Sequence, residues 1–401
     1  MMNFIFHTPS GKDEDVFEEQ NCVMNHKKIF SKFGKKAFII TGRFSAEKNG
    51  SLGDVKSALN EQGISWVHFN EIEENPSVET VVKAAEIGKR EKVDFVIGIG
   101  GGSPLDAAKA IALLIANPTE GADYLYNPEK KEEPLNVVAI PTTCGTGSEV
   151  TGVSVLTRKE LGTKKSIAHK IFPEVALIDP KYLRSASLTL ICNTAMDAFG
   201  HMAESALSKT RCSECLDAVE KGLKLFSEVK NYLVKAASSD EVMSDFTWDV
   251  YEKLILASMY GGIAIAYAGT TIPHGLSYQV TIRHNVPHGK AIGYFQYGFL
   301  KEAPKEERDR LLSFAGFSDI EELKKYFEVT CGKEKVPAEI LLSAVDEVAA
   351  NEPKMHASVF SVDREMLLRI VSYVSDKEIV NDYKRNKAGI EKIHSCFFYV
   401  C

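Results

Sequence analysis

The chain has 401 residues, of which 44% are hydrophobic and 26% are charged, and its formal net charge is −7 at pH 7. This composition indicates a soluble globular protein of about two domains and excludes a disordered or fibrous chain. Nucleic acids and anionic membrane surfaces are bound by a basic face, and no marked run of Lys and Arg is present. We therefore expect neither as a partner.

The beginning of the chain, MMNFIFHTPSGKDED, lacks a basic segment followed by an apolar core, so we predict no signal peptide. No apolar stretch approaches the roughly 18 residues that a membrane-spanning helix needs. The eight cysteines do not have the spacing of a disulfide framework, and the C-x-x-C of Cys212 and Cys215 has no second pair. We expect a cytoplasmic protein with reduced thiols.

The first half of the chain alternates short apolar runs with segments of helical periodicity. The first run ends near residue 42, and the other three cover residues 66–70, 94–100 and 136–142. Strands this apolar, separated by helical segments such as residues 104–116, are typical of a parallel sheet covered by helices on both faces. We predict an α/β, Rossmann-like dinucleotide-binding domain over residues 1–186.

The second half has a different pattern. From about residue 187, Ala, Leu, Glu and Lys are frequent and apolar residues recur at helical spacing. We predict an all-α domain over residues 187–401. Its tail after about residue 376 is polar and then apolar, and it suggests no function.

A glycine-rich turn follows the apolar run at residues 94–100. Bare backbone N–H groups and the dipole of the next helix suit a phosphate, and glycines let a diphosphate approach the backbone closely. Ser103 suits the N-cap of this helix and Pro104 its first position. A tight turn without a ligand is the alternative, since the G-x-G-x-G spacing departs from the dinucleotide fingerprint.

A second polar loop, from Pro141 to Glu149, follows another apolar run and concentrates hydroxyls and glycines. Considered by itself, this segment would be interpreted as a polar surface loop. Two such loops at the carboxyl ends of successive strands, where open α/β sheets bind ligands, favour a dinucleotide.

Four residues of the second half could form a metal site. Asp197 and His201 lie four apart in a helix-forming sequence, so both project from one face, although such a pair is often only a helix-surface pair. His274 and His288 are each followed by Gly and preceded directly or nearly by Pro, which predicts structured turns. Three imidazoles and one carboxylate suit Fe²⁺, Zn²⁺ or a similar ion, and a set without thiolate indicates an open catalytic site.

The chain resembles the iron-containing (group III) alcohol dehydrogenases through four motifs that occur in order. These are GGGS-x-x-D-x-A-K from Gly100 to Lys109, PTT-x-GTGSE from Pro141 to Glu149, G-x-D-A-x-x-H-x-x-E from Ala195 to Glu204, and the H-G and P-H-G elements at His274 and His288. The third motif departs at Ala195, where the family usually has Gly. The resemblance implies a nucleotide-binding domain, a helical metal-binding domain in a dehydroquinate synthase-like architecture, and a homodimer.

The resemblance also implies site residues. The metal ligands would be Asp197, His201, His274 and His288, with Fe²⁺ the first choice and Zn²⁺ the second. The cofactor contacts would be Gly42, Arg43, Ser45, Asn75, Gly101, Gly102, Ser103, Pro104, Asp106, Thr142, Thr143, Thr146, Ser148 and Lys165.

Two departures from the family pattern bear on the chemistry. Many members have a proton-relaying histidine where this chain has Tyr278, whose hydroxyl could take that part or simply pack; His284 is a weaker substitute. Relatives that use NAD carry an Asp after the first strand of the nucleotide domain, where this chain has Arg43 and Ser45, with Lys48 nearby. An Arg there suits a 2′-phosphate, so we predict NADP(H) over NAD(H).

We therefore expect a metal-dependent enzyme that interconverts a small primary alcohol and its aldehyde with NADP(H), and mainly reduces the aldehyde. Two alternatives remain open. One is a metal-dependent lyase or cyclase resembling dehydroquinate synthase, and the other is a non-catalytic sensor of nucleotide or metal.

Overall fold

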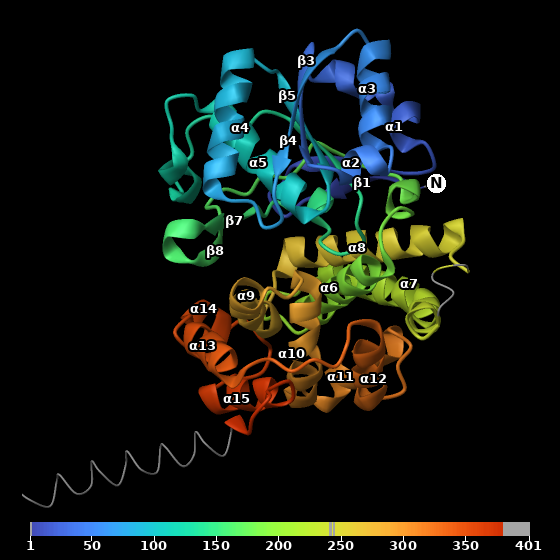
Figure 1. Ribbon diagram of the computed structural model, residues 1–401, viewed down its shortest axis with the longest axis vertical. Coiled ribbons are helices and arrows are strands. Elements are labelled where there is room, and N and C mark those ends of the chain that lie inside the picture. Colours follow the sequence, from blue (N-terminus) through green and yellow to red (C-terminus); the bar gives the residue numbers. More distant parts are fainter. Residues whose placement is uncertain (1, 240–242, 244, 380–401) are drawn as a thin grey trace, which may run out of the picture.

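The computed structural model describes residues 2–239, 243 and 245–379. An α/β half formed by the first part of the chain lies against a helical half formed by the rest (Figure 1). The sequence boundary predicted near residue 186 falls between the last strand of the sheet, which ends at Ile178, and a long helix that begins at Leu188.

The α/β half contains a seven-stranded sheet of order β1-β2-β9-β6-β5-β3-β4. Neighbouring strands are parallel except for β1, which is antiparallel to β2. A separate antiparallel hairpin is formed by β7 and β8. The strands are β1 Met2–His7, β2 Asp13–Glu18, β3 Lys36–Gly42, β4 Ser65–Ile72, β5 Phe95–Gly100, β6 Val137–Pro141, β7 Val155–Arg158, β8 Thr163–Ser166 and β9 Val175–Ile178.

The four predicted apolar strands are confirmed as β3, β4, β5 and β6 of a parallel sheet, to which β1 adds an antiparallel strand that was not predicted. The acidic segment DEDVFE forms β2, in which Glu14, Val16 and Glu18 are buried in alternation with more exposed residues. Buried glutamates conceal the apolar alternation by which a strand is recognised. The antiparallel pair of β1 and β2 was therefore missed.

Helices cover both faces of the sheet because successive side chains of a strand point to opposite faces. Phe38 and Ile40 of β3 pack with residues of α4 and α5, whereas Ala37 and Ile39 pack with residues of α1 and α3. These helices are α1 Cys22–Asn25, α2 Ser45–Lys48, α3 Ser51–Glu61, α4 Val78–Glu91 and α5 Gly102–Ala116, with 3₁₀ turns at Lys27–Lys32, Ala122–Tyr126, Ser148–Val150, Lys159–Leu161 and Pro180–Leu183.

The prediction of a helical second half is confirmed for the described residues. The helices are α6 Leu188–Ala206, α7 Ser213–Ala237, α8 Trp248–Ala268, α9 Ile272–His284, α10 His288–Glu302, α11 Lys305–Phe314, α12 Ile320–Thr330, α13 Ala338–Ala349, α14 Glu352–Met355 and α15 Arg364–Ser372. Within this part of the chain no single helix is long and apolar enough to span a membrane; α8 and α9 would qualify only as a pair bent by 112°. Most of the predicted tail after residue 376 lies outside the described residues.

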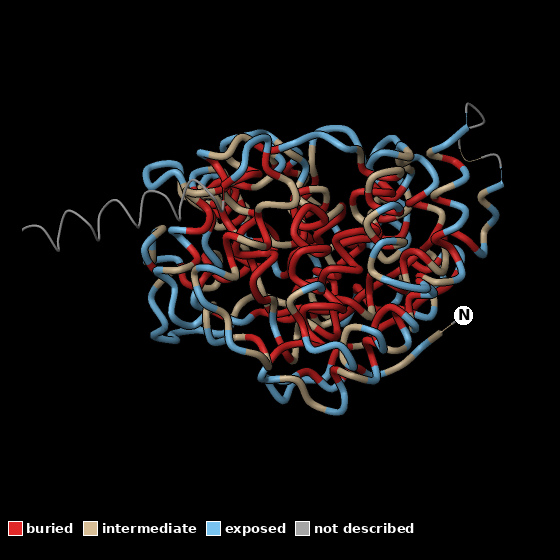
Figure 2. The backbone as a smooth tube through the Cα atoms, turned by 90° about the horizontal axis from the view of Figure 1, so that it is seen from below, coloured by how far each residue is buried: buried red, intermediate tan, exposed pale blue. Residues whose placement is uncertain are grey.

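One of the buried hydrophobic clusters spans both halves. It joins Phe6 of β1 and Val16 of β2 to residues of α6, α8 and α10. Figure 2 shows the buried backbone in the interior of the molecule. The second polar loop also packs on the helices: a Cβ on Gly147, whose φ is +58°, would lie 2.3 Å from the Cα of Gly262 in α8. Only glycine fits this contact, so the loop is fixed against the helical half.

Candidate metal and cofactor site

Helix α6 carries the first two predicted metal ligands. The side chain of Ser187 caps its first turn by accepting a hydrogen bond from the N–H of Leu190. Asp197 and His201 lie one turn apart and are buried, with His201 Nε2 3.5 Å from Asp197 Oδ1. The predicted common helix face is thus confirmed.

His274 and His288 lie in the first turns of α9 and α10, so the prediction that they occupy turns was wrong. Pro273 and Pro287 are compatible with helix starts, where a missing N–H leaves no bond unmade. The glycine after His288 has a packing reason, because a Cβ on Gly289 would lie 1.9 Å from the carbonyl oxygen of Asn193 in α6. Close contact of α10 with α6 brings His288 to the buried face of α6.

The candidate ligand atoms converge. One ligand atom each from Asp197, His274 and His288 lie within 4.8 Å of one another. His201 is outside this mutual set, but its ring stacks on that of His274 with centroids 4.8 Å apart. Asp197 Oδ1, His274 Nε2 and His288 Nδ1 are buried atoms that have no hydrogen-bond partner among the described residues. Buried polar atoms normally have partners, so these residues fit a divalent cation.

The protein surroundings keep the imidazoles of His201 and His288 neutral. Desolvation lowers the pKa of His201, and desolvation together with the positive charge of Lys164 lowers the pKa of His288 to about 3, against the opposing effect of Asp197. A neutral imidazole is the form that binds a metal ion, so protons compete weakly for this site at neutral pH.

Glu204, the last residue of the third motif, lies directly behind His274. It is fully buried and accepts a hydrogen bond from His274 Nδ1 at 2.6 Å and one from Gln296 Nε2 at 3.0 Å. Burial alone would raise the pKa of Glu204, but His274 holds it below the ordinary value. The sequence pattern contained this residue, but nothing in it indicated a bond to His274.

Tyr278 lies beside the cluster. Its ring is nearly parallel to that of His288, at 18°, with centroids 6.3 Å apart. Desolvation raises the pKa of Tyr278 to about 12, so the hydroxyl keeps its proton at neutral pH. His284, the weaker substitute, is exposed at the end of α9.

The glycine turn between β5 and α5 differs in detail from the prediction. Helix α5 begins at Gly102 with Gly101 as its N-cap, so Ser103 is not the N-cap and Pro104 is not the first helical residue. Ser103 Oγ instead accepts a hydrogen bond from the N–H of Asn75 at 3.1 Å. Asn75 has a left-handed φ of +56°, and its carbonyl oxygen accepts a bond from Thr157, which ties this turn to the β7–β8 hairpin.

The glycines of this turn have a further role beside the one that the sequence suggested. A Cβ on Gly101 would lie 3.1 Å from the side chain of Thr143, and one on Gly102 would lie 2.8 Å from Thr146. The missing side chains therefore let the two polar loops approach each other. Thr142 joins them through its N–H, which donates to the carbonyl oxygen of Gly100 at 2.9 Å. Gly101, Gly102, Ser103, Thr143 and Thr146 remain partly exposed at this edge.

Asp106 and Ser148 have polar atoms that are bonded within the protein. Ser148 Oγ donates to Asp106 Oδ1 at 2.5 Å, and the other carboxylate oxygen accepts from the N–H of Val155. The buried Lys109 donates to Ser148 Oγ at 2.8 Å. These bonds hold α5, the second loop and β7 together beneath the edge where the cofactor is expected.

Glu149 ends the second loop and leads to a pH prediction. It is 2% exposed, its Oε1 has no partner, and burial raises its pKa from 4.5 to about 7. The folded chain therefore keeps a proton that the unfolded chain releases, so this residue lowers stability as the pH rises from 4.5 to 7. We expect Glu149→Gln to raise the free energy of unfolding by up to about 3 kcal/mol at about pH 8 and by little near pH 4.5.

Denaturant unfolding of both proteins at the two pH values measures this effect. An equal gain at both pH values would contradict the buried proton, because glutamine removes a charge penalty that exists only at the higher pH.

The β7–β8 hairpin presents Lys164, rather than the expected Lys165, to the site. Lys165 is exposed and lies over the ring of Tyr126, with Nζ 5.6 Å from its centroid. Lys164 is buried and donates to Asn75 Oδ1 at 2.6 Å. Burial lowers the pKa of Lys164 to about 8, and Asp197 opposes this shift. Adjacent residues of a strand point to opposite faces. A shift of one residue in the expected position therefore replaces the buried Lys164 with the exposed Lys165.

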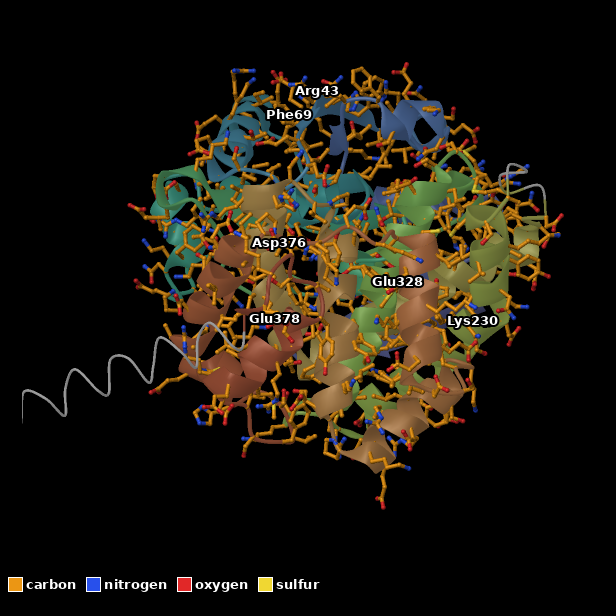
Figure 3. The ribbon with its side chains drawn as sticks, turned by 60° about the horizontal axis from the view of Figure 1, so that its bottom comes forward. Arg43, Phe69, Lys230, Glu328, Asp376 and Glu378 are labelled. Atoms are coloured by element: carbon orange, nitrogen blue, oxygen red, sulfur yellow. The ribbon has the colours of Figure 1, made fainter. Side chains whose placement is uncertain are left out.

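The end of β3 carries the residues on which the cofactor prediction rests. Gly42 ends the strand, and Arg43, Phe44 and Ser45 are all exposed. Figure 3 shows Arg43 at the surface of the α/β half. Phe44 is 76% exposed, an unusual position for a large apolar side chain without a partner. The segment offers a cation and a hydroxyl at the carboxyl end of a parallel strand.

The C-x-x-C cysteines lie at the start of α7. Cys212 is the N-cap of this helix, Cys215 is buried in its first turn, and both are free thiols.

Comparisons with known proteins cover most of the chain. The sequence profile of iron-containing alcohol dehydrogenase matches residues 14–180, and that of the C-terminal part of the Fe-containing alcohol dehydrogenase family matches residues 191–315. The NADPH-dependent butanol dehydrogenase of Clostridium saccharobutylicum is 27% identical over 91% of this chain and 92% of its own length. The NAD-dependent methanol dehydrogenase of Bacillus methanolicus is 31% identical over 64% of this chain and 65% of its own.

The fold agrees with this relationship. The crystal structure of an iron-containing alcohol dehydrogenase from Thermotoga maritima matches with a TM-score of 0.82 and 33% identity, covering 92% of this chain and 99% of the other. The two structures are therefore similar over both halves, including the helical half that carries the candidate metal ligands. With both profiles and this match in agreement, the chain belongs to the iron-containing alcohol dehydrogenase family.

Proposed function

We propose that this chain interconverts a small primary alcohol and its aldehyde with NADP(H), and that it acts mainly as an aldehyde reductase. The observation that carries the proposal is the buried convergence of unpartnered ligand atoms on Asp197, His274 and His288. A divalent ion bound there supplies Lewis acidity to the substrate oxygen, and a bound nicotinamide supplies or accepts the hydride.

The four ligands would hold the ion through three imidazoles and one carboxylate. Fe²⁺ is the first choice because the family is named for iron, and Zn²⁺ is the second because it accepts the same nitrogen and oxygen ligands. Burial of Asp197 and His274 excludes water from this side of the cluster, which strengthens electrostatic interactions with the substrate.

Two side chains beside the cluster are suited to handle the proton. Tyr278 keeps its hydroxyl proton at neutral pH and can donate it. Lys164, with a pKa of about 8, can exchange a proton near neutral pH and also places positive charge near the site. Tyr278 takes the position of the family's usual histidine, so we assign it the first part of this route.

The cofactor preference rests on the end of β3. Arg43 can bind the 2′-phosphate with charge-assisted hydrogen bonds, and Ser45 and Lys48 add a hydroxyl and a second cation. The NADPH dependence in the name of the butanol dehydrogenase relative supports this choice, whereas the methanol dehydrogenase relative is named for NAD. An NADPH preference in turn favours reduction in a cell.

We also propose a homodimer, as the family resemblance implies. Strand β1 is an open edge of the sheet, and its Ile5 is 53% exposed. An apolar side chain on an open strand edge is a common site of pairing between chains. Light scattering of the purified protein measures the mass in solution.

An assay of net cofactor turnover tests the proposed function. The metal-loaded protein is mixed with NADPH and a panel of small aldehydes, and NADP⁺ and alcohol should form in equal amounts. A lyase or cyclase would regenerate its cofactor in each cycle, so no oxidised cofactor would accumulate. A sensor would bind cofactor and metal without turnover, and either result would overturn the proposal.

A further inference from the structure

A layer of buried polar side chains lies behind the metal ligand His274. Glu204 Oε1 accepts a hydrogen bond from His274 Nδ1 at 2.6 Å and is also held by Gln296. With Nδ1 as the donor, the lone pair of the ring is on Nε2, the atom that is buried without a partner. The carboxylate thus selects the tautomer that turns a free lone pair toward the metal cluster.

The same carboxylate fixes the start of α9, the helix that carries His274. The N-cap residue Thr271 makes no side-chain capping bond of its own. Glu204 Oε2 instead accepts from the backbone N–H of Thr271 at 2.7 Å, and at 3.4 Å from that of His274. A carboxylate at a helix N-terminus satisfies orphan N–H groups and favours the helix dipole.

Lys354 of α14 holds the other side of this helix start. Its Nζ donates to the carbonyl oxygen of Thr270 at 2.8 Å, to Thr270 Oγ1 at 3.2 Å and to the carbonyl oxygen of Thr271 at 3.2 Å. All three donors of the ammonium are therefore used. Desolvation lowers the pKa of Lys354, and the negative charge of Glu204 opposes that effect. The two charges stabilise each other across the residues that precede His274.

We propose that Glu204 and Lys354 are positioning residues for the metal site: Glu204 fixes the tautomer and direction of His274, and Lys354 fixes the chain segment from which His274 projects. This inference rests on the metal site of the proposed function. Lys354 lies beyond residue 315, where the matched family profile ends, so the profile match does not include it. The last part of the helical half thus contributes to metal affinity.

The test measures Zn²⁺ affinity on metal-free protein by competition with a chelator, because Zn²⁺ is redox-inert and suits nitrogen and oxygen ligands. Glu204→Gln and Lys354→Met should each weaken the Zn²⁺ Kd by about 10- to 100-fold, as losses of outer-layer partners typically do. Lys354→Arg keeps the cation but not the compact group with three donors on one nitrogen, so it should restore only part of the affinity that Lys354→Met loses.

Lys230 provides a matched control. It is also a buried lysine of the helical half, 6% exposed, with Nζ 3.2 Å from Glu322 Oε1, and Figure 3 shows it away from the α/β half. Lys230→Met should lower the melting temperature and leave the Zn²⁺ Kd within about twofold, because it removes a buried lysine and its ion pair with the more exposed Glu322 without touching α9.

The possible outcomes distinguish failure of the positioning roles from failure of the metal site itself. The positioning roles are overturned if either Glu204→Gln or Lys354→Met binds Zn²⁺ with the Kd of the unsubstituted protein. They are also overturned if Lys230→Met weakens binding as much as Lys354→Met, because the effect would then follow from general destabilisation. If the unsubstituted protein binds no Zn²⁺ or Fe²⁺, the metal site of the proposed function fails instead.

Discussion

Replacing Asp197 with alanine is expected to abolish metal binding and turnover while leaving the chain folded. Asp197 supplies the one carboxylate among the candidate ligands, and its buried Oδ1 accepts no hydrogen bond from the described residues. Loss of the Lewis acid removes several kcal/mol of transition-state stabilisation, which is a rate loss of about 10³-fold or more. Removing an unpartnered buried carboxylate should not lower the melting temperature of the metal-free protein.

Elemental analysis, steady-state kinetics and thermal unfolding measure the three parts of this prediction. His274→Ala should behave in the same way toward metal and turnover. His284→Ala serves as the control, because His284 is exposed at the end of α9 and lies outside the ligand cluster. Retention of one metal ion per chain and of activity in Asp197→Ala would contradict the ligand assignment.

Replacing Arg43 with aspartate is expected to lower kcat/KM for NADPH by about 10²-fold and to raise the relative use of NADH. The change removes a charge-assisted bond to the 2′-phosphate and adds repulsion, together worth about 3 kcal/mol. Kinetics with both cofactors at one saturating aldehyde concentration give the ratio directly. The effect should be confined to the cofactor, since Arg43 is exposed and lies in the α/β half rather than among the candidate metal ligands.

Arg90→Asp is the matched control for this change. Arg90 is also an exposed arginine of the α/β half. It lies in the last turn of α4, just before β5 begins, and therefore at the amino ends of the parallel strands rather than at their carboxyl ends. It should leave the cofactor ratio unchanged. An NADH efficiency equal to or above that of NADPH in the unsubstituted protein would contradict the cofactor assignment before any variant is made.

The parts of the site that depend on local spacing could be predicted from the sequence. Asp197 and His201 share a helix face because four residues make about one turn, and the glycine turn follows a strand whose every residue is buried. The sequence also indicated the two histidines that complete the cluster, but it did not indicate that they lie in helices. They lie at helix starts, because Pro at or before the first helical position permits a helix as readily as a turn.

The parts that depend on tertiary contacts could not be predicted. The choice between Lys164 and Lys165 depends on which face of a short hairpin is buried, and both residues are lysine. Glu204 was visible as a motif residue, but its partner His274 lies 70 positions away. Lys354 gave no local signal, because its three acceptors are two backbone carbonyls and one hydroxyl.

The strand β2 shows why burial can be concealed. Glu14 is fully buried with both carboxylate oxygens unpartnered, and desolvation raises its pKa well above the ordinary value. A protonated glutamate can occupy a position where an apolar residue would normally mark a strand. The composition of such a segment therefore resembles that of an exposed acidic segment rather than that of a buried strand.

The most direct test of the central claim is activity as a function of metal content. The protein is purified without oxygen, stripped with a chelator and titrated with Fe²⁺ or Zn²⁺, while NADPH-dependent aldehyde reduction is followed. We predict that activity disappears on stripping and returns in proportion to the bound ion, up to one ion per chain. Full aldehyde reduction by the stripped protein would contradict it.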